Sequence, residues 1–291
     1  MVVIEILRSL RPQQWIKNFF IFAPVVFSRN FTDPSLVLRT AAAFAAFCLV
    51  SSAHYIFNDL MDLEEDKLHP VKSKRPLASG RLKKGPAVAA MLVLGALGLG
   101  MAAWLNLPFF VLCLGYIVLQ VLYSVRLKHV VILDIFVIAA GFVIRVVAGG
   151  LVIRVSISSW LLICTMLLSL FLAMGKRRHE LVILEGAAPN HRPILKEYNT
   201  DFLDQMISVV TASTLVAYCL YTISEETVAK FGTRNMIFTV PFVLYGIFRY
   251  LYLIHLRSEG GSPEHLILKD KPLLADIFLW IAASIVILAL R

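Results

Sequence analysis

The sequence predicts an all-α protein that crosses the membrane nine times and forms a single transmembrane domain over residues 1–291. The first observation is composition, because 59% of the residues are hydrophobic, whereas soluble domains contain about 45–50% apolar residues. The second is that the apolar residues form nine runs of roughly the length that crosses a bilayer. The third is that Lys and Arg gather in alternate loops between these runs. Together these observations predict a multi-pass membrane protein.

Nine apolar runs are predicted to be spanning helices. A spanning helix needs about 20 apolar residues, and the first and the fourth run are the shortest of the nine. The runs cover residues 15–27, 36–57, 86–104, 108–123, 132–153, 158–174, 202–223, 236–255 and 273–290.

The distribution of positive charge predicts the orientation. With nine spans, the loops on the side of the N-terminus carry 20 Lys and Arg residues, and the opposite side carries six. Lys and Arg collect on the cytoplasmic side of membrane proteins, so we expect the N-terminus and the long polar loops in the cytoplasm, with the protein in the inner (plasma) membrane. With eight spans, cation-rich and cation-poor loops would fall on the same side of the membrane. We expect no cleaved signal peptide, because residues 1–14 contain Glu5, Arg8 and Arg11 in place of a long apolar stretch.

Four cysteines lie far apart within apolar runs, and we expect them to be free, small hydrophobic side chains. They are Cys48, Cys113, Cys164 and Cys219. The net charge of +9 follows from the cationic loops of a membrane protein, and no nucleic-acid-binding motif accompanies it. Nucleic acid is therefore not a predicted partner.

An acidic segment directly follows the apolar run of residues 36–57, with five acidic residues within eight positions. If the run continues as a helix, one face carries three carboxylates with an amide and a phenol beside them. These residues are Asp59, Asp62 and Asp66, with Asn58 and Tyr55. Three carboxylates on one stripe repel one another unless a cation lies between them, which indicates Mg²⁺ holding a diphosphate. On such a helix Glu64 falls roughly opposite Asp59 and is expected to be solvated. The alternative for the whole segment is a charged helix end at the membrane surface.

A basic loop follows the acidic segment within a few turns. In this loop, Arg75 is fixed by Pro76 and can clamp phosphate oxygens with two hydrogen bonds, while Lys72 can act as a point charge. The alternative is a loop whose positive charge only marks the cytoplasmic side, and we prefer that interpretation for Lys83 and Lys84.

The acidic and basic motifs together resemble the first signature of the UbiA superfamily of intramembrane prenyltransferases. The resemblance rests on Asn58-Asp59-x-x-Asp62-x-x-x-Asp66, followed by Arg75-Pro76-Leu77-Ala78-Ser79-Gly80. The nine-span pattern matches across the whole chain. The resemblance implies a UbiA-like intramembrane transferase fold in which Asp59, Asp62 and Asp66 bind Mg²⁺ and the diphosphate of a prenyl donor.

The second signature of that superfamily differs in this chain. Members typically carry another Asp-x-x-x-Asp motif after the sixth span, where this chain has Lys176-Arg177-Arg178-His179-Glu180. Cations in place of a carboxylate pair let a site accept more negative charge, which changes the expected substrate. The alternative is a basic segment that marks where the helix leaves the membrane.

The cationic segment resembles one branch of the superfamily, the polyprenyl-phosphate (decaprenyl-phosphate) 5-phosphoribosyltransferases. Three further motifs fit that branch. They are Arg11-Pro12-Gln13-Gln14-Trp15-Ile16-Lys17-Asn18, Tyr123-Ser124-x-x-Leu127-Lys128 with Asp134, and Ile144-Arg145 followed by Ala148-Gly149-Gly150. The resemblance implies that the diphosphate belongs to phosphoribosyl pyrophosphate (PRPP) and that a lipid phosphate is the acceptor.

Arg145 is an ionisable residue within a predicted span. Such a residue costs free energy and faces a cavity or a partner. Helical geometry places it on the same face as Asp134 and Gly141, but about 16 Å along the helix from Asp134, which is too far for a direct ion pair. A structural contact and a place near the substrate are equal alternatives.

The branch implies an Mg²⁺-dependent pentosyltransferase that moves 5-phosphoribosyl from PRPP to a polyprenyl phosphate and releases diphosphate, with the pentose used for cell-wall arabinan. Asp59, Asp62 and Asp66 are the predicted catalytic residues and metal ligands. The predicted substrate-binding residues are Lys17, Tyr55, Asn58, Lys72, Arg75, Tyr123, Lys128, Asp134, Arg145, Lys176, Arg177 and Glu180. The expected partners are PRPP, the polyprenyl phosphate and the bilayer, and a homo-oligomer is left open.

Two other functions stay open. Prenyl transfer from a prenyl diphosphate to a small acceptor keeps the fold and changes the reaction. A transporter or lipid-binding protein would carry out no catalysis. The one-sided distribution of charged loops argues against transport, because a transporter needs access from both sides of the membrane.

Overall fold

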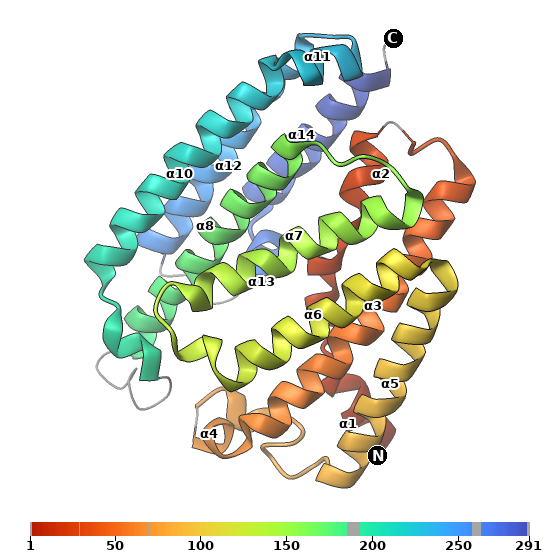
Figure 1. The fold of residues 1–291 in the computed structure, drawn as a ribbon. Helices are drawn as coiled ribbons and strands as arrows, with labels where there is room; N and C mark the ends of the chain where they lie inside the picture. Colours follow the sequence, from red (N-terminus) through yellow and green to blue (C-terminus); the bar gives the residue numbers. More distant parts are fainter. Residues whose placement is uncertain (1, 29, 69, 185–192, 258–262, 290–291) are drawn as a thin grey trace. The chain divides into compact units, whose positions relative to one another are not determined.

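The computed structural model describes residues 2–28, 30–68, 70–184, 193–257 and 263–289, and every regular element within these ranges is a helix. This confirms the predicted all-α class for the described residues. The chain divides into two compact units (Figure 1). One unit consists of Met1–Ile157 with Asn190–Ile194, and the other of Ser158–Pro189 with Leu195–Arg291.

The first unit is built around four long helices. They are α3 (Pro34–Met61), α5 (Lys84–Leu105), α6 (Leu107–Val125) and α7 (Leu133–Ile153). The shorter elements are α1 (Val2–Ser9), η1 (Pro12–Phe22), α2 (Ala23–Phe27), α4 (Leu63–Leu68), η2 (Lys72–Lys74) and η3 (Leu127–His129), where η marks a 3₁₀-helix.

Side-chain caps set the start of two of these helices. Asp33 accepts hydrogen bonds from the backbone N–H groups two and three residues ahead, at 2.8 and 3.3 Å, and Pro34 takes the first position of α3. Asn106 accepts a hydrogen bond from the Phe109 N–H at 2.8 Å and begins α6. Both caps satisfy N–H groups that the start of a helix leaves without partners.

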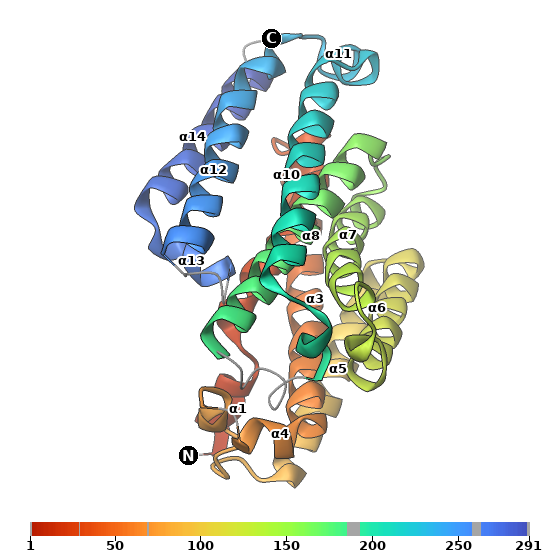
Figure 2. The ribbon, with the colours of Figure 1, turned by 90° about the vertical axis from the view of Figure 1, so that its left-hand side faces the viewer.

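The second unit is also built around four long helices. They are α8 (Ser159–Leu184), α10 (Thr200–Ile223), α12 (Val240–Leu256) and α14 (Lys271–Ala289), with α11 (Glu225–Phe231), η5 (Asn235–Thr239) and α13 (Pro263–Lys269) between them. The short η4 (Pro193–Glu197) contains residues of both units. Helices α12 and α14 lie side by side (Figure 2). Inside this unit the Tyr218 hydroxyl lies 2.7 Å from Thr239 Oγ1 and accepts a hydrogen bond from Trp280 Nε1 at 2.8 Å.

Eight helices of the described residues are long and apolar enough to cross a membrane, judged by length and composition. They coincide with eight of the nine predicted runs. The run at residues 236–255 is formed by η5 and α12 together. The prediction of a multi-pass membrane protein is thereby confirmed.

The first predicted run has a different geometry, because residues 12–27 form a 3₁₀-helix that leads directly into a short α-helix. A 3₁₀-helix rises about 2.0 Å per residue and an α-helix about 1.5 Å. The 11 residues of η1 and the 5 residues of α2 therefore reach about 30 Å, the apolar thickness of a bilayer. The predicted apolar run, residues 15–27, accounts for about 24 Å of this length, and it is not one of the eight long helices.

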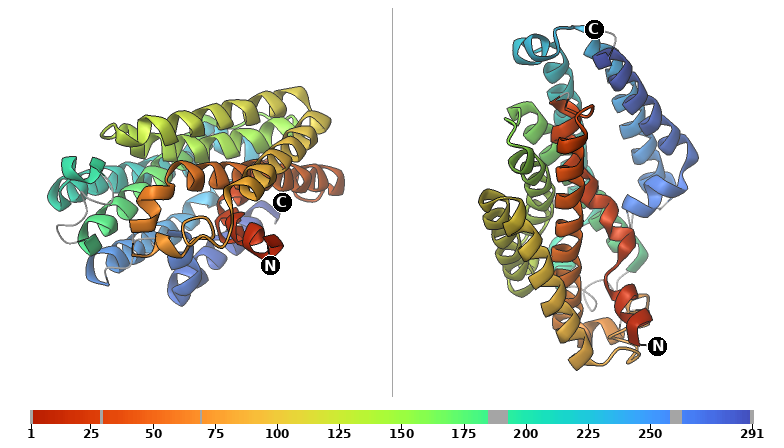
Figure 3. Two further views of the ribbon diagram at one scale, coloured as in Figure 1. Left: turned by 90° about the horizontal axis from the view of Figure 1, so that it is seen from below. Right: turned by 90° about the vertical axis from the view of Figure 1, so that its right-hand side faces the viewer.

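The segment formed by η1 and α2 runs antiparallel to α3 (Figure 3). Near its start, Trp15 Nε1 donates a hydrogen bond to Ser52 Oγ at 3.0 Å. Near its end, the ring of Phe22 lies 5.8 Å from the ring of Phe44. The segment therefore follows α3 from its C-terminal half back toward its start.

Two glycines allow close packing of the backbones in the first unit. A Cβ at Gly149 of α7 would lie 2.0 Å from the carbonyl oxygen of Ile21 in η1, and a Cβ at Gly98 of α5 would lie 2.8 Å from Val50 of α3. At such distances a side chain at either position would force the neighbouring atoms to shift. The core where these elements meet is apolar and aromatic, and its large members include Ile21, Phe47, Phe109 and Tyr116.

Candidate active site

The acidic segment lies where α3 ends. α3 stops at Met61, Asp62 has φ −91° and ψ 13°, and α4 begins at Leu63. Two backbone hydrogen bonds continue across this point, from the Asp62 N–H to the Asn58 carbonyl at 2.9 Å and from the Asp66 N–H to the Asp62 carbonyl at 2.8 Å. The chain stays coiled but is no longer one regular helix, and the carboxylates of the predicted stripe separate.

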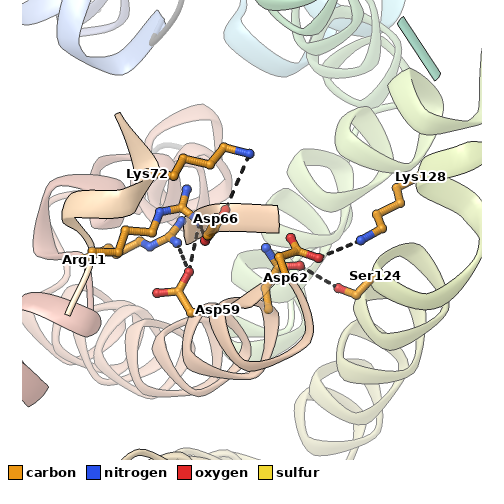
Figure 4. A network of polar contacts seen from close by, with 9 residues as sticks. Arg11, Asp59, Asp62, Asp66, Lys72, Ser124 and Lys128 are labelled. Carbon is orange, nitrogen blue, oxygen red and sulfur yellow. Dashed lines mark hydrogen bonds and ion pairs between the residues drawn. The ribbon is translucent and has the colours of Figure 1, made fainter. Parts of the chain in front are cut away.

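Asp59 and Asp66 form a buried carboxylate pair (Figure 4). Only 2% of Asp59 and 1% of Asp66 is exposed. Arg75 Nη1 donates to Asp59 Oδ1 at 3.1 Å and to Asp66 Oδ2 at 2.5 Å, so one nitrogen bridges both carboxylates. Arg11 also donates a hydrogen bond to Asp59 Oδ1, and its guanidinium lies 5.3 Å from the centre of the Tyr55 ring. The structure thus brings together four predicted site residues and Arg11, to which the sequence analysis assigned no role. The four are Tyr55, Asp59, Asp66 and Arg75.

Lys72 adds a further positive charge at the pair. Its Nζ lies 3.8 Å from Asp66 Oδ1, a buried oxygen that has no hydrogen bond from any residue that the structure describes. The loop that carries Lys72 and Arg75 is held by apolar side chains. These anchors are Leu77 and Leu82, which belong to a buried cluster with Ile56 and Leu63. The cations are therefore presented from a loop with a fixed base.

Asp62 contacts a different set of residues. Its Oδ1 accepts a hydrogen bond from Lys128 Nζ at 2.7 Å, and the neighbouring Asn58 Oδ1 accepts one from Ser124 Oγ at 3.1 Å (Figure 4). Asp62 therefore contacts other partners than the Asp59–Asp66 pair, because the regular helix ends before it. Its predicted role as a third metal ligand stays a prediction. Within the described ranges, no three or more His, Cys, Asp or Glu side chains are grouped so that they could hold a metal ion.

The Asp59–Asp66 pair nevertheless fits a hard divalent cation. Mg²⁺ is usually bound by one or two carboxylates together with waters and substrate phosphates. The position between the two carboxylates already holds a cationic nitrogen of Arg75, and within the described part of the chain Asp66 Oδ1 has no hydrogen-bond donor. Both observations mark a place that takes positive charge, so the donor set agrees with the predicted Mg²⁺.

Glu64 lies outside this cluster, as helical geometry predicted. It is exposed and accepts a hydrogen bond from Lys67 Nζ at 2.8 Å. This hydrogen bond holds the pKa of the Glu64 carboxyl below its usual value. Glu64 is therefore a solvated carboxylate on the same segment as the buried pair.

Arg145 has only neutral partners among the described residues. The side chain is buried, with 4% of the residue exposed. Its Nε donates to Asn18 Oδ1 at 2.8 Å, and its Nη1 donates to the Gly141 carbonyl at 2.7 Å. Its Nη2 donates to the Tyr116 hydroxyl at 3.2 Å, and three aromatic rings surround it at 5.0 to 5.6 Å. These contacts tie η1 to α6 and α7, which favours the structural alternative for Arg145.

Three other predicted residues of the first unit lie on separate elements. Lys17 of η1 donates a hydrogen bond to Gln14 Oε1 at 2.5 Å. Tyr123 is half-buried on α6, and Asp134 is fully buried in the first turn of α7. Their roles in substrate binding stay predictions.

The cationic segment of α8 belongs to the second unit and is largely paired within it. Arg177 is 1% exposed and donates to Glu180 Oε2 at 2.7 Å. Arg178 donates to both carboxylate oxygens of Asp204, at 2.6 and 3.3 Å. Two of the three cations thus form ion pairs inside their own unit, and the role of Lys176 stays a prediction.

Sequence reasoning did not assign a role to Arg11 or Ser124. Both residues lie within motifs that carry the family resemblance, but their types alone do not single them out. Arg11 stands before Pro12 with a left-handed backbone, φ 52° and ψ 62°, at the point where η1 begins. An Arg-Pro pair that starts a spanning segment is the signal that could have identified it.

The fold and the site define a multi-pass helical membrane protein with a buried aspartate pair, bridged by arginine, at the end of a long span. The UbiA prenyltransferase family matches residues 19–265. The chain therefore belongs to the UbiA family, which confirms the resemblance found in its motifs.

Curated relatives match this chain over most of their length. It is 30% identical over 291 residues to the decaprenyl-phosphate phosphoribosyltransferase of Mycolicibacterium smegmatis, covering 96% of this chain and 91% of the relative. It is 31% identical over 281 residues to the Corynebacterium glutamicum protein of the same name, covering 94% and 84%. A solved UbiA homolog from Archaeoglobus fulgidus bound to GPP and Mg²⁺ has a TM-score of 0.74 at 20% identity, covering 98% of this chain and 99% of that chain. The structural likeness confirms the predicted fold.

Proposed function

We propose that this protein transfers a 5-phosphoribosyl group from PRPP to a polyprenyl phosphate and releases diphosphate. The observation that carries the proposal is the buried Asp59–Asp66 pair, which is met by three cations. These cations are Arg11, Lys72 and Arg75. A site with more positive than negative charge suits a highly anionic donor. The names of the relatives support a phosphoribosyl group as the group transferred.

The substrates of this reaction carry an unusually high negative charge. PRPP has a diphosphate and a separate 5-phosphate, and the acceptor brings a phosphate of its own. We assign Lys17, Arg75 and Lys128 to these phosphates in the first unit, and Lys176 in the second. Arg177, which forms an ion pair with Glu180, is assigned to the same phosphates because it lies in the cationic segment that replaces the second acidic motif.

The reaction breaks the bond between ribose C1 and the diphosphate oxygen and forms a bond between C1 and an oxygen of the lipid phosphate. The lipid phosphate is already ionised, so no Ser/His or Cys/His nucleophile is needed. Held by Asp59 and Asp66, Mg²⁺ would neutralise negative charge on the leaving diphosphate. Arg75 and Lys72 donate hydrogen bonds to the same oxygens as charge develops on them. Asp62 and Asn58 orient the donor from the side of α6.

The chemistry is proposed for the cytoplasmic face of the plasma membrane, because the loops that carry Lys72 and Lys128 belong to the cation-rich side. Both units are proposed to form one catalytic domain. The family match over residues 19–265 supports this, since it includes residues of both units.

Transfer of label into lipid tests the proposal. The full-length protein in lipid nanodiscs is incubated with Mg²⁺, PRPP labelled in the ribose, and decaprenyl phosphate, and the label in the lipid phase is measured. We expect labelled lipid only when donor, acceptor and Mg²⁺ are all present. In a parallel incubation with a prenyl diphosphate and a small acceptor, consumption of the prenyl diphosphate, without labelled lipid in the first assay, would instead identify a prenyl transfer. With the protein reconstituted into vesicles, ion-coupled uptake without any product would identify a transporter.

A further inference from the structure

We propose that Arg75 holds the place of the divalent cation, so that the site accepts its metal only together with a diphosphate. The inference rests on the metal–diphosphate site of the proposed function. It does not depend on whether a phosphoribosyl or a prenyl group is transferred.

The geometry of one nitrogen supports this proposal. Arg75 Nη1 lies 3.1 Å from Asp59 Oδ1 and 2.5 Å from Asp66 Oδ2. A group that contacts one oxygen of each carboxylate occupies the position from which a cation neutralises both. With Arg75 in place, the two residues are only 2% and 1% exposed, and a buried charge left without a partner is strongly unfavourable. Arg75 therefore has to stay until other positive charge arrives.

The charges around the pair make a metal alone unfavourable. Two carboxylates are already met by three cations, Arg11, Lys72 and Arg75. A divalent cation alone would increase the local excess of positive charge, and like charges at these short distances repel strongly in a poorly solvated site. A diphosphate, with about three negative charges, would cancel this excess. The positive and negative charges of the site therefore balance when metal and diphosphate enter together.

Arg75 can leave its position without a rearrangement of the fold. Its side chain is 25% exposed, whereas the Asp59 and Asp66 side chains are each 2% exposed. The backbone of its loop is anchored by Leu77, which is buried. A change of side-chain rotamer is enough for the guanidinium to release the carboxylates. It can then bind phosphate oxygens through two parallel hydrogen bonds.

Metal binding to the full-length protein in nanodiscs tests the proposal, with Mn²⁺ as the probe and no PRPP or lipid acceptor present. The dissociation constant of the protein for Mn²⁺ is measured with and without inorganic pyrophosphate. It is calculated from the concentration of free Mn²⁺, because pyrophosphate itself binds the metal. We expect Mn²⁺ to bind at least about tenfold more tightly with pyrophosphate, and pyrophosphate to gain the same factor from Mn²⁺, because such coupling is reciprocal. Equal Mn²⁺ affinity under the two conditions would overturn the proposal.

Removal of the guanidinium provides the second arm of the test. In Arg75→Gln, Mn²⁺ alone should bind at least about tenfold more tightly than in the wild type, and the dependence on pyrophosphate should shrink. Arg81→Gln is the matched control, because Arg81 lies in the same loop but contacts other groups than the carboxylate pair. Its Nε lies 3.6 Å from Glu5 Oε2, and its Nη2 donates to the Lys74 carbonyl. The control should bind Mn²⁺ and pyrophosphate like the wild type.

A second variant covers the case in which Arg75→Gln does not fold. Arg75→Lys keeps the charge but lacks the planar guanidinium, so its affinity for Mn²⁺ alone should lie between those of the wild type and Arg75→Gln. If the folded variant binds Mn²⁺ alone no more tightly than the wild type, Arg75 is not a place-holder. Coupling that persists while the labelled-lipid assay fails would leave this inference standing and refute only the proposed transfer.

Discussion

Arg145 Nε donates a hydrogen bond of 2.8 Å to Asn18 Oδ1 across 127 residues of sequence. Asn18 in turn donates to Cys48 Sγ at 3.1 Å and to Ser51 Oγ at 3.3 Å. One buried amide thus connects η1, α3 and α7. Arg11 stands at the start of the same 3₁₀-helix, about two turns before Asn18, so one helix carries both this anchor and the cation beside the carboxylate pair.

Arg145→Met is expected to destabilise the protein. The substitution leaves the buried Asn18 amide oxygen without its donor, which costs about 1–3 kcal/mol. It also removes the side-chain hydrogen bonds to the Gly141 carbonyl and the Tyr116 hydroxyl. We expect the free energy of unfolding, measured in detergent with a chemical denaturant, to fall by about 3 kcal/mol. Arg154→Gln, an exposed position at the end of the same helix, should change it by less than about 0.5 kcal/mol. Equal losses in the two variants would contradict the structural role of Arg145.

Gly149→Ala is expected to disturb the contact between α7 and η1. The added Cβ would lie 2.0 Å from the Ile21 carbonyl oxygen, so the backbones must separate, and overpacking of this kind costs about 1–3 kcal/mol. Gly115→Ala is the matched control, since a Cβ there meets nothing within 4 Å and alanine favours the helix. Thermal unfolding should place Gly149→Ala below the wild type and Gly115→Ala at or above it. The reverse order would refute the close approach of η1.

Asp59→Asn and Asp66→Asn are expected to abolish transfer while the protein still folds. Each substitution keeps the shape of the side chain and removes a charge that the proposed metal requires. Activity should fall at least about 100-fold, since even the outer partners of metal ligands are worth 10–100-fold. Glu64→Gln removes an exposed carboxylate of the same segment and should retain wild-type transfer. Activity near that of the wild type in either aspartate variant would exclude the metal assignment.

Lys128→Gln is expected to weaken binding of the donor. Lys128 is the cation on the α6 side of the site, where it contacts Asp62 at 2.7 Å. A hydrogen bond to a charged group is worth about 1.5–3 kcal/mol, so the KM for PRPP should rise by at least about tenfold. Arg126→Gln, an exposed cation two residues earlier, serves as the control. An unchanged KM for PRPP in Lys128→Gln would remove this residue from the site.

The ion pair between Arg249 and Asp270 predicts a loss of stability in acid. Arg249 donates to both carboxylate oxygens, at 3.1 and 2.8 Å, and these hydrogen bonds hold the pKa of Asp270 below its usual value. A carboxyl with a depressed pKa stabilises the fold above its unfolded pKa of about 3.9 and loses this contribution as the pH falls through the folded pKa. Between about pH 5 and pH 3 the wild type should therefore lose more stability than Asp270→Asn. If the free energy of unfolding falls by the same amount in both proteins over this pH range, the prediction is refuted.

Hydropathy was sufficient to predict eight spanning helices, because the partition of an apolar run into the bilayer depends on its composition and length. It could not predict the 3₁₀ geometry of residues 12–22. That geometry accompanies contacts with distant residues, such as Asn18 with Arg145 and the Ile21 carbonyl with Gly149. A pattern of apolar residues carries no information about such partners.

The acidic stripe was predicted from helical periodicity, and it holds only in part. The periodicity assumed a regular helix beyond Met61, whereas Asp62 is the residue at which α3 ends. Its carboxylate then bonds Lys128, which lies 66 residues further along the chain. Two of the three carboxylates converge because a loop arginine bridges them, and the sequence identified that arginine through the motif that follows the acidic segment.

The 3₁₀ geometry of η1 makes its length more important than most of its side chains. Three residues complete one turn of such a helix, so Trp15, Asn18 and Ile21 lie on one side of it. Trp15 and Asn18 contact Ser52 and Arg145 through their side chains, and Ile21 approaches Gly149 through its carbonyl oxygen. Insertion or deletion of a single residue would rotate everything beyond it by a third of a turn and break the remaining contacts. Related chains that keep this arrangement should therefore vary at the outward positions of the segment without any change in the number of residues between Trp15 and Ile21.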